Sequence, residues 1–469
     1  MAITGTAQGA TPFLGTISAT IGGANLGSVT ATVAPQAGSH TRPFAATFVA
    51  NWLARTGKLS NGQVTVPVYF LYAAQANTVA LMFRFMDGSS VTTSAVITTP
   101  AYRDPCGRLS NPTMQQNRTA TADIGFDYFV LKNFCSVDTP AIIDTDAAPR
   151  WVSTANVATQ SSAFFRNGFY ASNGGSGINR IELDGTVTPL ADFSALGVTF
   201  TGHHNIDPGR DGLIVDVNTS TQTESVDIEF DARTGAIRNR WDLADIIGAA
   251  MRAGGDDPSG FVFPAGTDWF HNNATTYNKV DNTLIVSSRE NFVIAVDYDA
   301  PADGSVRKIH WILGDPTKHW AQYASLRKYA LTLPNGASPP IGQHAVSIDH
   351  LGNLLLFNDG YGSAVQQPPG MTRPYSISQS FRIDPIARTA TEVFNFTLSS
   401  KYSYICGSIY EGYPGHYLID YADEQAGNTE LIGLGAGKRQ VFDIDYPTSN
   451  YCAAGWNASP IKGHTLLFQ

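Results

Sequence analysis

The sequence has few charged residues and no long apolar segment. Only 15% of its 469 residues are charged, and the net charge is −9 at pH 7, which argues against nucleic acid or anionic membranes as the main partner. No run of about 18 apolar residues occurs, so no transmembrane span is predicted. The first residues also lack the basic and apolar regions of a signal peptide, so we expect either a cytosolic chain or a mature form whose signal has been removed.

A complete nucleotide-binding loop is also missing. The glycine-rich segment 433–439 resembles a P-loop, but Ile432 stands where the first glycine is needed and Arg439 replaces the required Ser or Thr. A nucleotide donor therefore has no support, and we expect no cofactor.

Cysteine is scarce, with four residues that form no Cys-x-x-Cys motif and have no histidine pair nearby. One interpretation is four free buried thiols. The simplest pairing instead joins Cys106 to Cys135 and Cys406 to Cys452, and each bridge would contribute about 3 to 4 kcal/mol. Pairing would favour an oxidising compartment, and we expect a periplasmic or secreted protein.

Residues typical of turns and strands are abundant in this sequence. The 44 glycines and 25 prolines are dispersed between short runs of Val, Ile, Phe, Tyr and Thr, which predicts an all-β fold. The segment Asp242 to Arg252 is the best helical candidate. Alternating stretches at 28–33, 64–72 and 78–85 predict an N-terminal β-sandwich domain over residues 1–145. The segment Asp138 to Arg150, with two prolines, is the expected linker.

Three histidines occupy the same place in three copies of one strand pattern. His204, His271 and His344 are separated by 67 and 73 residues, and each precedes a turn and an apolar run. A fourth copy begins at Gly407 and has no histidine. Repeats that carry a functional residue in some copies predict a β-propeller with a site on its axis.

A second repeated element supports this prediction. Three segments of the form apolar-x-apolar-Asp lead to an aromatic residue 10 to 12 positions later: Ile228 to Trp241, Val296 to Trp311, and Phe381 to Phe394. Each is typical of an outer hairpin of one blade. Residues 146–469 are therefore predicted to form a six-bladed β-propeller that carries the catalytic site.

Residues suited to an anion surround these histidines. Asn273 lies two positions after His271, so on a regular strand both side chains would share a face. Arg289 follows the apolar run 283–286, and its guanidinium matches sulfate, phosphate or carboxylate oxygens. Imidazoles, an amide and a guanidinium together predict a site for a tetrahedral oxyanion.

These motifs resemble those of the bacterial arylsulfate sulfotransferase family. The resemblance covers most of the chain and rests on the combination of the segments 67–72, 76–79, 203–206, 268–273, 284–291, 342–346 and 356–360.

The resemblance implies a six-bladed propeller that moves a sulfuryl group from an aryl sulfate donor to a phenolic acceptor, without 3′-phosphoadenylyl sulfate. It implies a ping-pong mechanism with His344 as the nucleophile that becomes sulfohistidine. His271, Asn273 and Arg289 would bind the sulfuryl oxygens, and His204 would complete this set or act as acid or base. A neutral imidazole is a competent nucleophile near pH 7.

Several assignments stay open at this stage. The repeat alignment favours His204 over His203 as the residue that faces the site, and Ser408, beside the copy without a histidine, is a candidate lining residue. The family usually has aspartate after the nucleophile, where this chain has Ala345. Another group must then orient His344, and a backbone carbonyl could do so.

Two alternative functions remain. Histidines that converge on a propeller axis can also hold a metal ion, although the missing fourth histidine and the cation of Arg289 oppose a metal-dependent enzyme. A non-catalytic propeller that binds a ligand is the second alternative. A homodimer is one expected assembly.

Overall fold

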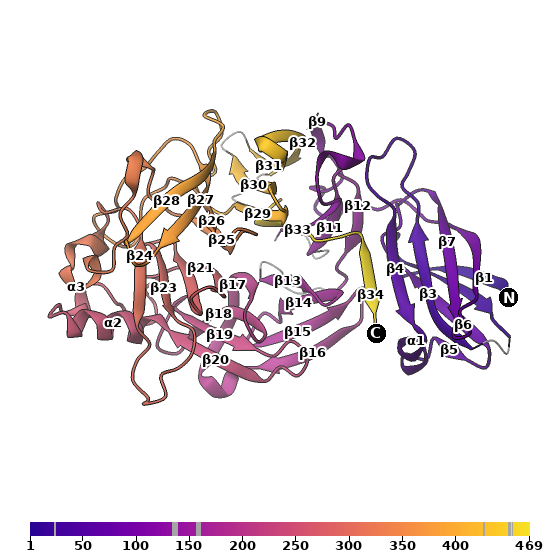
Figure 1. Cartoon of the computed structure of the whole chain (residues 1–469), viewed down its shortest axis with the longest axis horizontal. Helices are drawn as coiled ribbons and strands as arrows, with labels where there is room; N and C mark the ends of the chain where they lie inside the picture. The colour runs from indigo at the N-terminus through magenta and orange to yellow at the C-terminus, as the bar shows by residue number, and fades with distance from the viewer. Residues whose placement is uncertain (23–24, 134–138, 156–160, 425–426, 449–451, 453) are drawn as a thin grey trace.

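The computed structural model describes residues 1–469 apart from 23–24, 134–138, 156–160, 425–426, 449–451 and 453. Figure 1 shows two bodies, a ring of sheets and a smaller β domain that contains the N-terminus. The predicted all-β class, with a propeller and an N-terminal sandwich, is confirmed. No helix among the described residues is long and apolar enough to span a membrane.

The N-terminal domain consists of two sheets that pack on one core. Its strands alternate: in β7 (Ala76–Phe85), Val79, Leu81 and Phe83 are buried and the residues between them face outward. One sheet has the order β1 (Ala2–Gln8), β2 (Gly15–Thr20), β6 (Gln63–Val68), β5 (Leu59–Ser60). The other has the order β34 (Thr465–Phe468), β4 (Phe44–Val49), β3 (Leu26–Val33), β7, β8 (Ser90–Thr98), with α1 (Ala50–Arg55) after β4.

The ring contains six further sheets of four or five strands in the described part of the chain. Four are simple meanders of consecutive strands. The first consists of β13 (Ser162–Phe165), β14 (Gly168–Ser172), β15 (Gly177–Glu182) and β16 (Val187–Asp192), and the second of β17 (Val198–Pro208), β18 (Leu213–Thr219), β19 (Val226–Phe230) and β20 (Ile237–Asp242). The third consists of β21 (Asn272–Asn278), β22 (Thr283–Ser288), β23 (Val293–Asp297) and β24 (Ile309–Leu313), and the fourth of β25 (His344–Ile348), β26 (Leu354–Asn358), β27 (Ile377–Asp384) and β28 (Thr389–Phe396). Each has the strand number and order of one propeller blade.

The two remaining sheets close the ring with strands from distant parts of the sequence. One has the order β12 (Pro149–Val152), β11 (Ala141–Asp144), β10 (Tyr128–Lys132), β33 (Asn457–Ile461). The other has the order β29 (Ser408–Tyr413), β30 (His416–Glu424), β31 (Asn428–Gly435), β32 (Arg439–Pro447), β9 (Thr113–Gln116). The chain end then returns to the sandwich, where β34 pairs with β4 in parallel.

This closure changes two expectations. The expected domain boundary is at residue 145, whereas β9, β10 and β11 precede that residue and belong to ring sheets. The expected linker at 138–150 is wrong, because 141–144 and 149–152 form β11 and β12 and most of these residues are buried. Pairing between strands more than 300 residues apart leaves no local signal in a sequence.

Other local predictions are confirmed. The three repeated segments form the outer hairpins β19–β20, β23–β24 and β27–β28. The helical candidate is α2 (Leu243–Ala253), where Asp242 caps the helix by accepting a hydrogen bond from the backbone N–H of Asp245. A short helix, α3 (Ala324–Arg327), packs beside it. Middle strands such as β22 and β26 are buried throughout, because neighbouring blades cover both of their faces.

Candidate functional site

The innermost strand of each blade begins irregularly in the three copies that carry histidines. Strand pairing shifts between Thr201 and Ile206 in β17, between Asn272 and Ala274 in β21, and between His344 and Ser347 in β25. Such bulges re-aim side chains at the end of a sheet. They turn the three histidines toward the axis of the ring.

These histidines meet in one cavity of about 600 Å³. The ring centroid of His204 lies 4.8 Å from that of His271 and 5.9 Å from that of His344. The convergence that the repeat predicts is therefore present. The cavity is lined by Phe200, His203, His204, Glu224, Asp268, His271, Arg289, Glu290, His344, Ala364, Val365, Ile405, Cys406 and Trp456.

Two oxygen atoms lie close to one ring nitrogen of His344. Its Nδ1 lies 3.0 Å from the carbonyl oxygen of Gly342 and 2.8 Å from Oδ2 of Asp359. A carbonyl can only accept a hydrogen bond, so Nδ1 carries the proton and Nε2 keeps its lone pair. Burial, together with the charges of Arg289 and His271, holds the pKa of His344 well below its usual value.

His271 has the opposite electrostatic environment. Its Nδ1 contacts Oδ2 of Asp268 and lies 3.2 Å from Oε2 of Glu224. Burial lowers the pKa of His271, but the two carboxylates outweigh this effect and raise it above its usual value. The cavity thus combines a neutral imidazole at His344 with an imidazole that is inclined to be protonated.

His204 lies between these two rings. It is 4% exposed, and its ring packs 5.1 Å from that of Trp456. Burial and the neighbouring histidines hold the pKa of His204 well below its usual value. Its Nδ1 is buried and has no hydrogen-bond partner among the described residues.

His203 also lines the cavity, but carboxylates and an amide hold both of its ring nitrogens. Its Nδ1 lies 3.0 Å from Oδ2 of Asp216, and Nδ2 of Asn218 lies 3.1 Å from its Nε2. Burial lowers the pKa of His203, but the contact with Asp216 outweighs this effect and raises it to about 9. Of the two adjacent histidines, only His204 stacks on the other site histidines.

Arg289 supplies the fixed cation. Its backbone N–H donates to the carbonyl oxygen of His271 at 3.0 Å, and its Nη1 donates to Oε1 of Glu290 at 2.8 Å. Lys318 is buried and donates to the Arg289 carbonyl oxygen at 3.0 Å. These contacts fix the direction of the guanidinium toward the cavity.

Two predicted residues lie outside the described lining of this cavity. Asn273 donates through Nδ2 to the carbonyl oxygen of Gln343 at 2.7 Å. Ser408 donates to the Ala458 carbonyl oxygen at 2.9 Å and accepts from the Ala458 N–H at 3.1 Å. The bulge next to Asn273, and the φ of +52° at His271, remove the two-residue alternation that would have placed both side chains on one face.

The structure adds residues that sequence reasoning did not assign. Glu224 comes from the loop between β18 and β19, Trp456 from the segment before β33, and Asp359 from the end of β26. Asp359 lies in the segment 356–360, one of the motifs of the family resemblance, and could have been found there. No periodicity or motif marks Glu224 or Trp456.

One predicted disulfide is present in this region. Cys406 and Cys452 are bonded, with 6.4 Å between their Cα atoms, and Cys406 lines the cavity. Cys106 is also disulfide-bonded, whereas its expected partner Cys135 lies outside the described residues. The free-thiol interpretation is therefore wrong for Cys106, Cys406 and Cys452.

A metal ion could be held by part of this cluster. Among the described residues, ligating atoms of His204, Glu224 and His271 lie within 4.8 Å of one another. Against this, Nδ1 of His271 and Glu224 already face each other, and the cation of Arg289 lines the same cavity. The donor set suits an anion better than a second cation.

Fold and site together define a β-propeller with a histidine-lined cavity at the inner strands. Residues 113–456 match the family model "Arylsulfotransferase (ASST)", and the chain belongs to this family.

Named relatives extend the comparison. The chain is 26% identical over 286 residues to the arylsulfate sulfotransferase AssT of Escherichia coli O6:H1, a match that covers 58% of this chain and 41% of that protein. It is 22% identical over 260 residues to AssT of Lelliottia amnigena, covering 52% and 38%. The matches span about two fifths of the length of these relatives.

Solved structures are more distant. A Bacteroides thetaiotaomicron protein of unknown function matches with a TM-score of 0.34 and 12% identity over 95% of this chain and 97% of that one. The β-propeller domain of Myceliophteria thermophila Cps50 matches with a TM-score of 0.36 and 10% identity over 72% of this chain and all of that one.

Proposed function

We propose that this chain transfers a sulfuryl group from an aryl sulfate to a phenol, without 3′-phosphoadenylyl sulfate, through a sulfohistidine at His344. The observation that carries the proposal is the orientation of His344. Its Nδ1 is bound to the Gly342 carbonyl and faces Asp359, so Nε2 is the nucleophilic atom, in a cavity that also contains Arg289. Membership of the arylsulfotransferase family supports the donor class.

The negative charge on the sulfuryl oxygens is stabilised by cationic hydrogen-bond donors. Arg289 presents its planar donor fork, and protonated His271 presents Nε2–H because its Nδ1 faces carboxylates. His204, which lines the same cavity, completes the oxygen-binding set. Fixed charges in a buried site are often the largest single contribution to catalysis. Asn273 contributes by holding the carbonyl of Gln343, the residue before the nucleophile.

The same arrangement provides a group that transfers the proton in each of the two steps. In the first step Nε2 of His344 attacks sulfur, the bond from sulfur to the aryl oxygen breaks, and His271 gives its Nε2 proton to the departing phenolate. In the second step neutral His271 takes the proton of the acceptor phenol, whose oxygen attacks sulfur while the bond from sulfur to His344 breaks. Both histidines return to their starting states.

The disulfide indicates the cellular compartment of the protein. A disulfide joins Cys406 to Cys452, and disulfides persist in oxidising compartments. We therefore assign the chain to the periplasm or the extracellular space.

Turnover of 4-nitrophenyl sulfate with phenol tests the function. The wild type should release nitrophenolate and form phenyl sulfate, and His344→Ala should do neither. His310→Ala is the matched control, because His310 is exposed and pairs with Asp297 at 2.8 Å, outside the cavity lining. Substantial transfer by His344→Ala would contradict the nucleophile assignment.

The metal-dependent alternative is favoured by the proximity of His204, Glu224 and His271. Elemental analysis of the purified protein separates the two functions. A stoichiometric transition metal, with activity lost on chelation and restored on its return, would replace the sulfohistidine mechanism. Ligand binding without turnover of any aryl sulfate would instead indicate the non-catalytic module.

A further inference from the structure

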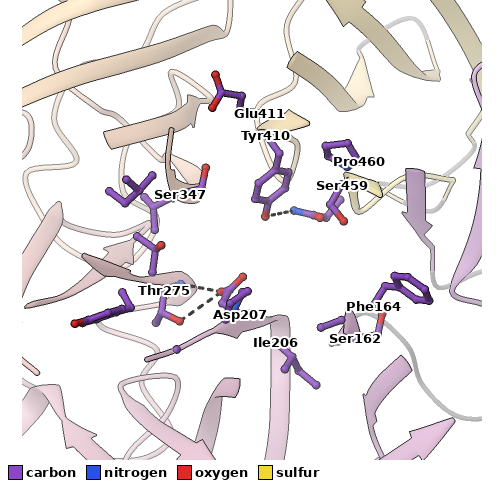
Figure 2. A pocket seen from close by; sticks show the side chains of 18 of the residues that line it. Ser162, Phe164, Ile206, Asp207, Thr275, Ser347, Tyr410, Glu411, Ser459 and Pro460 are labelled. Atoms are coloured by element: carbon purple, nitrogen blue, oxygen red, sulfur yellow. Dashed lines mark hydrogen bonds between the residues drawn. The ribbon is translucent and has the colours of Figure 1, made fainter. Parts of the chain in front are cut away.

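A second cavity lies at the opposite end of the inner strands. The histidine cavity is lined by residues up to His204 in β17, by His271 just before β21 and by His344 at the start of β25. Later residues of the same strands line another space of about 390 Å³. The two linings have no residue in common. Figure 2 shows this second cavity, with side chains from separate strands directed into it. We call it the distal chamber.

A hydrogen-bonded layer separates the two cavities. Nζ of Lys132 donates to Oδ1 of Asn205 at 2.8 Å, and Nδ2 of Asn205 donates to the carbonyl oxygen of Asn273 at 3.2 Å. Asn273 in turn donates to the carbonyl oxygen of Gln343 at 2.7 Å. Along β17 and β21, Asn205 and Asn273 therefore lie between the residues that line the two cavities.

The chamber has polar groups with unused hydrogen-bonding capacity. In Figure 2, Asp207 and Tyr410 point into the same space. The Tyr410 hydroxyl oxygen accepts from Nδ2 of Asn457 at 3.1 Å, which leaves its own proton available. Oδ1 of Asn457 is buried without a partner among the described residues. Lys132 is 4% exposed, and the hydrogen bond to Asn205 uses one of its three N–H groups.

The carboxylate in this chamber is fixed in place. Oδ2 of Asp207 accepts from the backbone N–H of Thr275 at 2.9 Å. Burial raises the pKa of Asp207 to about 7 and lowers that of Lys132 to about 8.

The rest of the lining is mostly apolar. Ile206 and Val346 are each 2% exposed, and Phe164, Tyr277 and Pro460 contribute their rings, whereas Ser162, Ser347, Ser459, Glu411 and Lys462 add polar groups. A cavity with mostly apolar walls and a few convergent polar groups is the usual form of a small-molecule site. Its volume suits one small aromatic ring with substituents.

We propose that the distal chamber binds a phenol as a second ligand site, distinct from the sulfuryl-transfer site. A phenolic hydroxyl can donate to Asp207 and accept from Lys132 or Tyr410, and its ring fits between the apolar walls. An aryl sulfate fits less well, because its anionic head would face the carboxylate of Asp207. The inference stands on the chamber itself and does not depend on the proposed function.

Calorimetric titration of the full chain with 4-iodophenol, without any sulfate donor, tests this inference. The wild type should bind iodophenol in the chamber. Tyr410→Phe, which removes one hydroxyl, should weaken that binding about 5-fold. Ser347→Phe, which fills the chamber, should abolish it. Tyr413→Phe is the matched control, because Tyr413 lies on the same strand, is 56% exposed and is outside the chamber lining.

Crystals grown with iodophenol would locate the ligand through the anomalous signal of iodine. Iodine in the chamber, together with the loss of that binding in Ser347→Phe, would support the proposal. No iodine there, or equal binding by all variants, would overturn it. Sulfuryl transfer by Ser347→Phe is measured in parallel. A variant that still transfers the sulfuryl group but no longer binds iodophenol in the chamber would show that the chamber is a ligand site separate from the transfer site.

Discussion

Oδ2 of Asp359 lies 2.8 Å from Nδ1 of His344, and both side chains are buried. The carboxyl group comes from the end of β26, the strand that pairs with the strand on which His344 begins. The carbonyl oxygen of Gly342 lies 3.0 Å from the same nitrogen, so both groups bear on the orientation of His344, the proposed nucleophile.

Asp359→Asn should lower kcat about 10- to 100-fold with little change in KM, because it changes the group 2.8 Å from Nδ1 of His344 but leaves the proposed substrate contacts in place. Steady-state kinetics with 4-nitrophenyl sulfate measures both constants. Asp420→Asn is the control, since Asp420 is equally buried but, unlike Asp359, makes no described contact with His344, and it should keep wild-type kcat. Equal losses in both variants would indicate a general effect on folding.

The pair of His203 and Asp216 should make stability depend on pH. The pKa of His203 is raised to about 9 in the folded chain, against about 6.5 when unfolded. A raised pKa stabilises the fold fully below about pH 6.5, and this contribution is lost as the pH rises through about 9. The shift corresponds to something on the order of 3 kcal/mol.

Urea unfolding of the wild type and of His203→Gln checks this expectation. The difference in unfolding free energy between the two should be largest at pH 6 and should shrink by pH 9.5. A difference that is constant over this range would show that His203 contributes by packing alone.

Ala345 should be a site of backbone strain next to the nucleophile. Its φ is +55°, a region that costs a residue with a Cβ atom roughly 1 kcal/mol. Ala345→Gly should therefore raise the unfolding free energy by about 0.5 to 1 kcal/mol, whereas Ala345→Val should lower it. Chemical denaturation measures both, and destabilisation by glycine would contradict the backbone conformation described.

The disulfide should stabilise the wall of the cavity. Cys406 and Cys452 are 46 residues apart in sequence, so replacing both by serine should reduce the unfolding free energy by about 4 kcal/mol. Trp456, four residues after Cys452, stacks on His204, so KM should also rise. Chemical denaturation and steady-state kinetics of the double variant test the two effects. An unfolding free energy equal to that of the wild type would show that the disulfide does not stabilise the fold.

The sequence predicted the parts of the site that repeat. His204, His271 and His344 occur at equivalent positions of inner strands, so a propeller necessarily brings them together. Arg289 was found for the same reason, as the residue after a motif strand. Asn273 was expected on the face of His271, but a bulge breaks the alternation on which that expectation depended.

Other features depend on contacts that no local pattern encodes. Glu224 reaches His271 from a loop, and Trp456 reaches His204 because β33 closes the ring against β10. The same closure moved the boundary between the two domains, since strands before residue 145 pair with strands near the C-terminus. Contacts over several hundred residues are fixed by the assembled fold rather than by sequence spacing.

The most direct test of the central claim is intact-mass spectrometry after brief incubation with 4-nitrophenyl sulfate and no acceptor. The account predicts a stoichiometric burst of nitrophenolate and one added sulfuryl group, which peptide mapping places on His344 and which phenol removes. Full activity without any adduct, or an adduct on a residue other than His344, would contradict it.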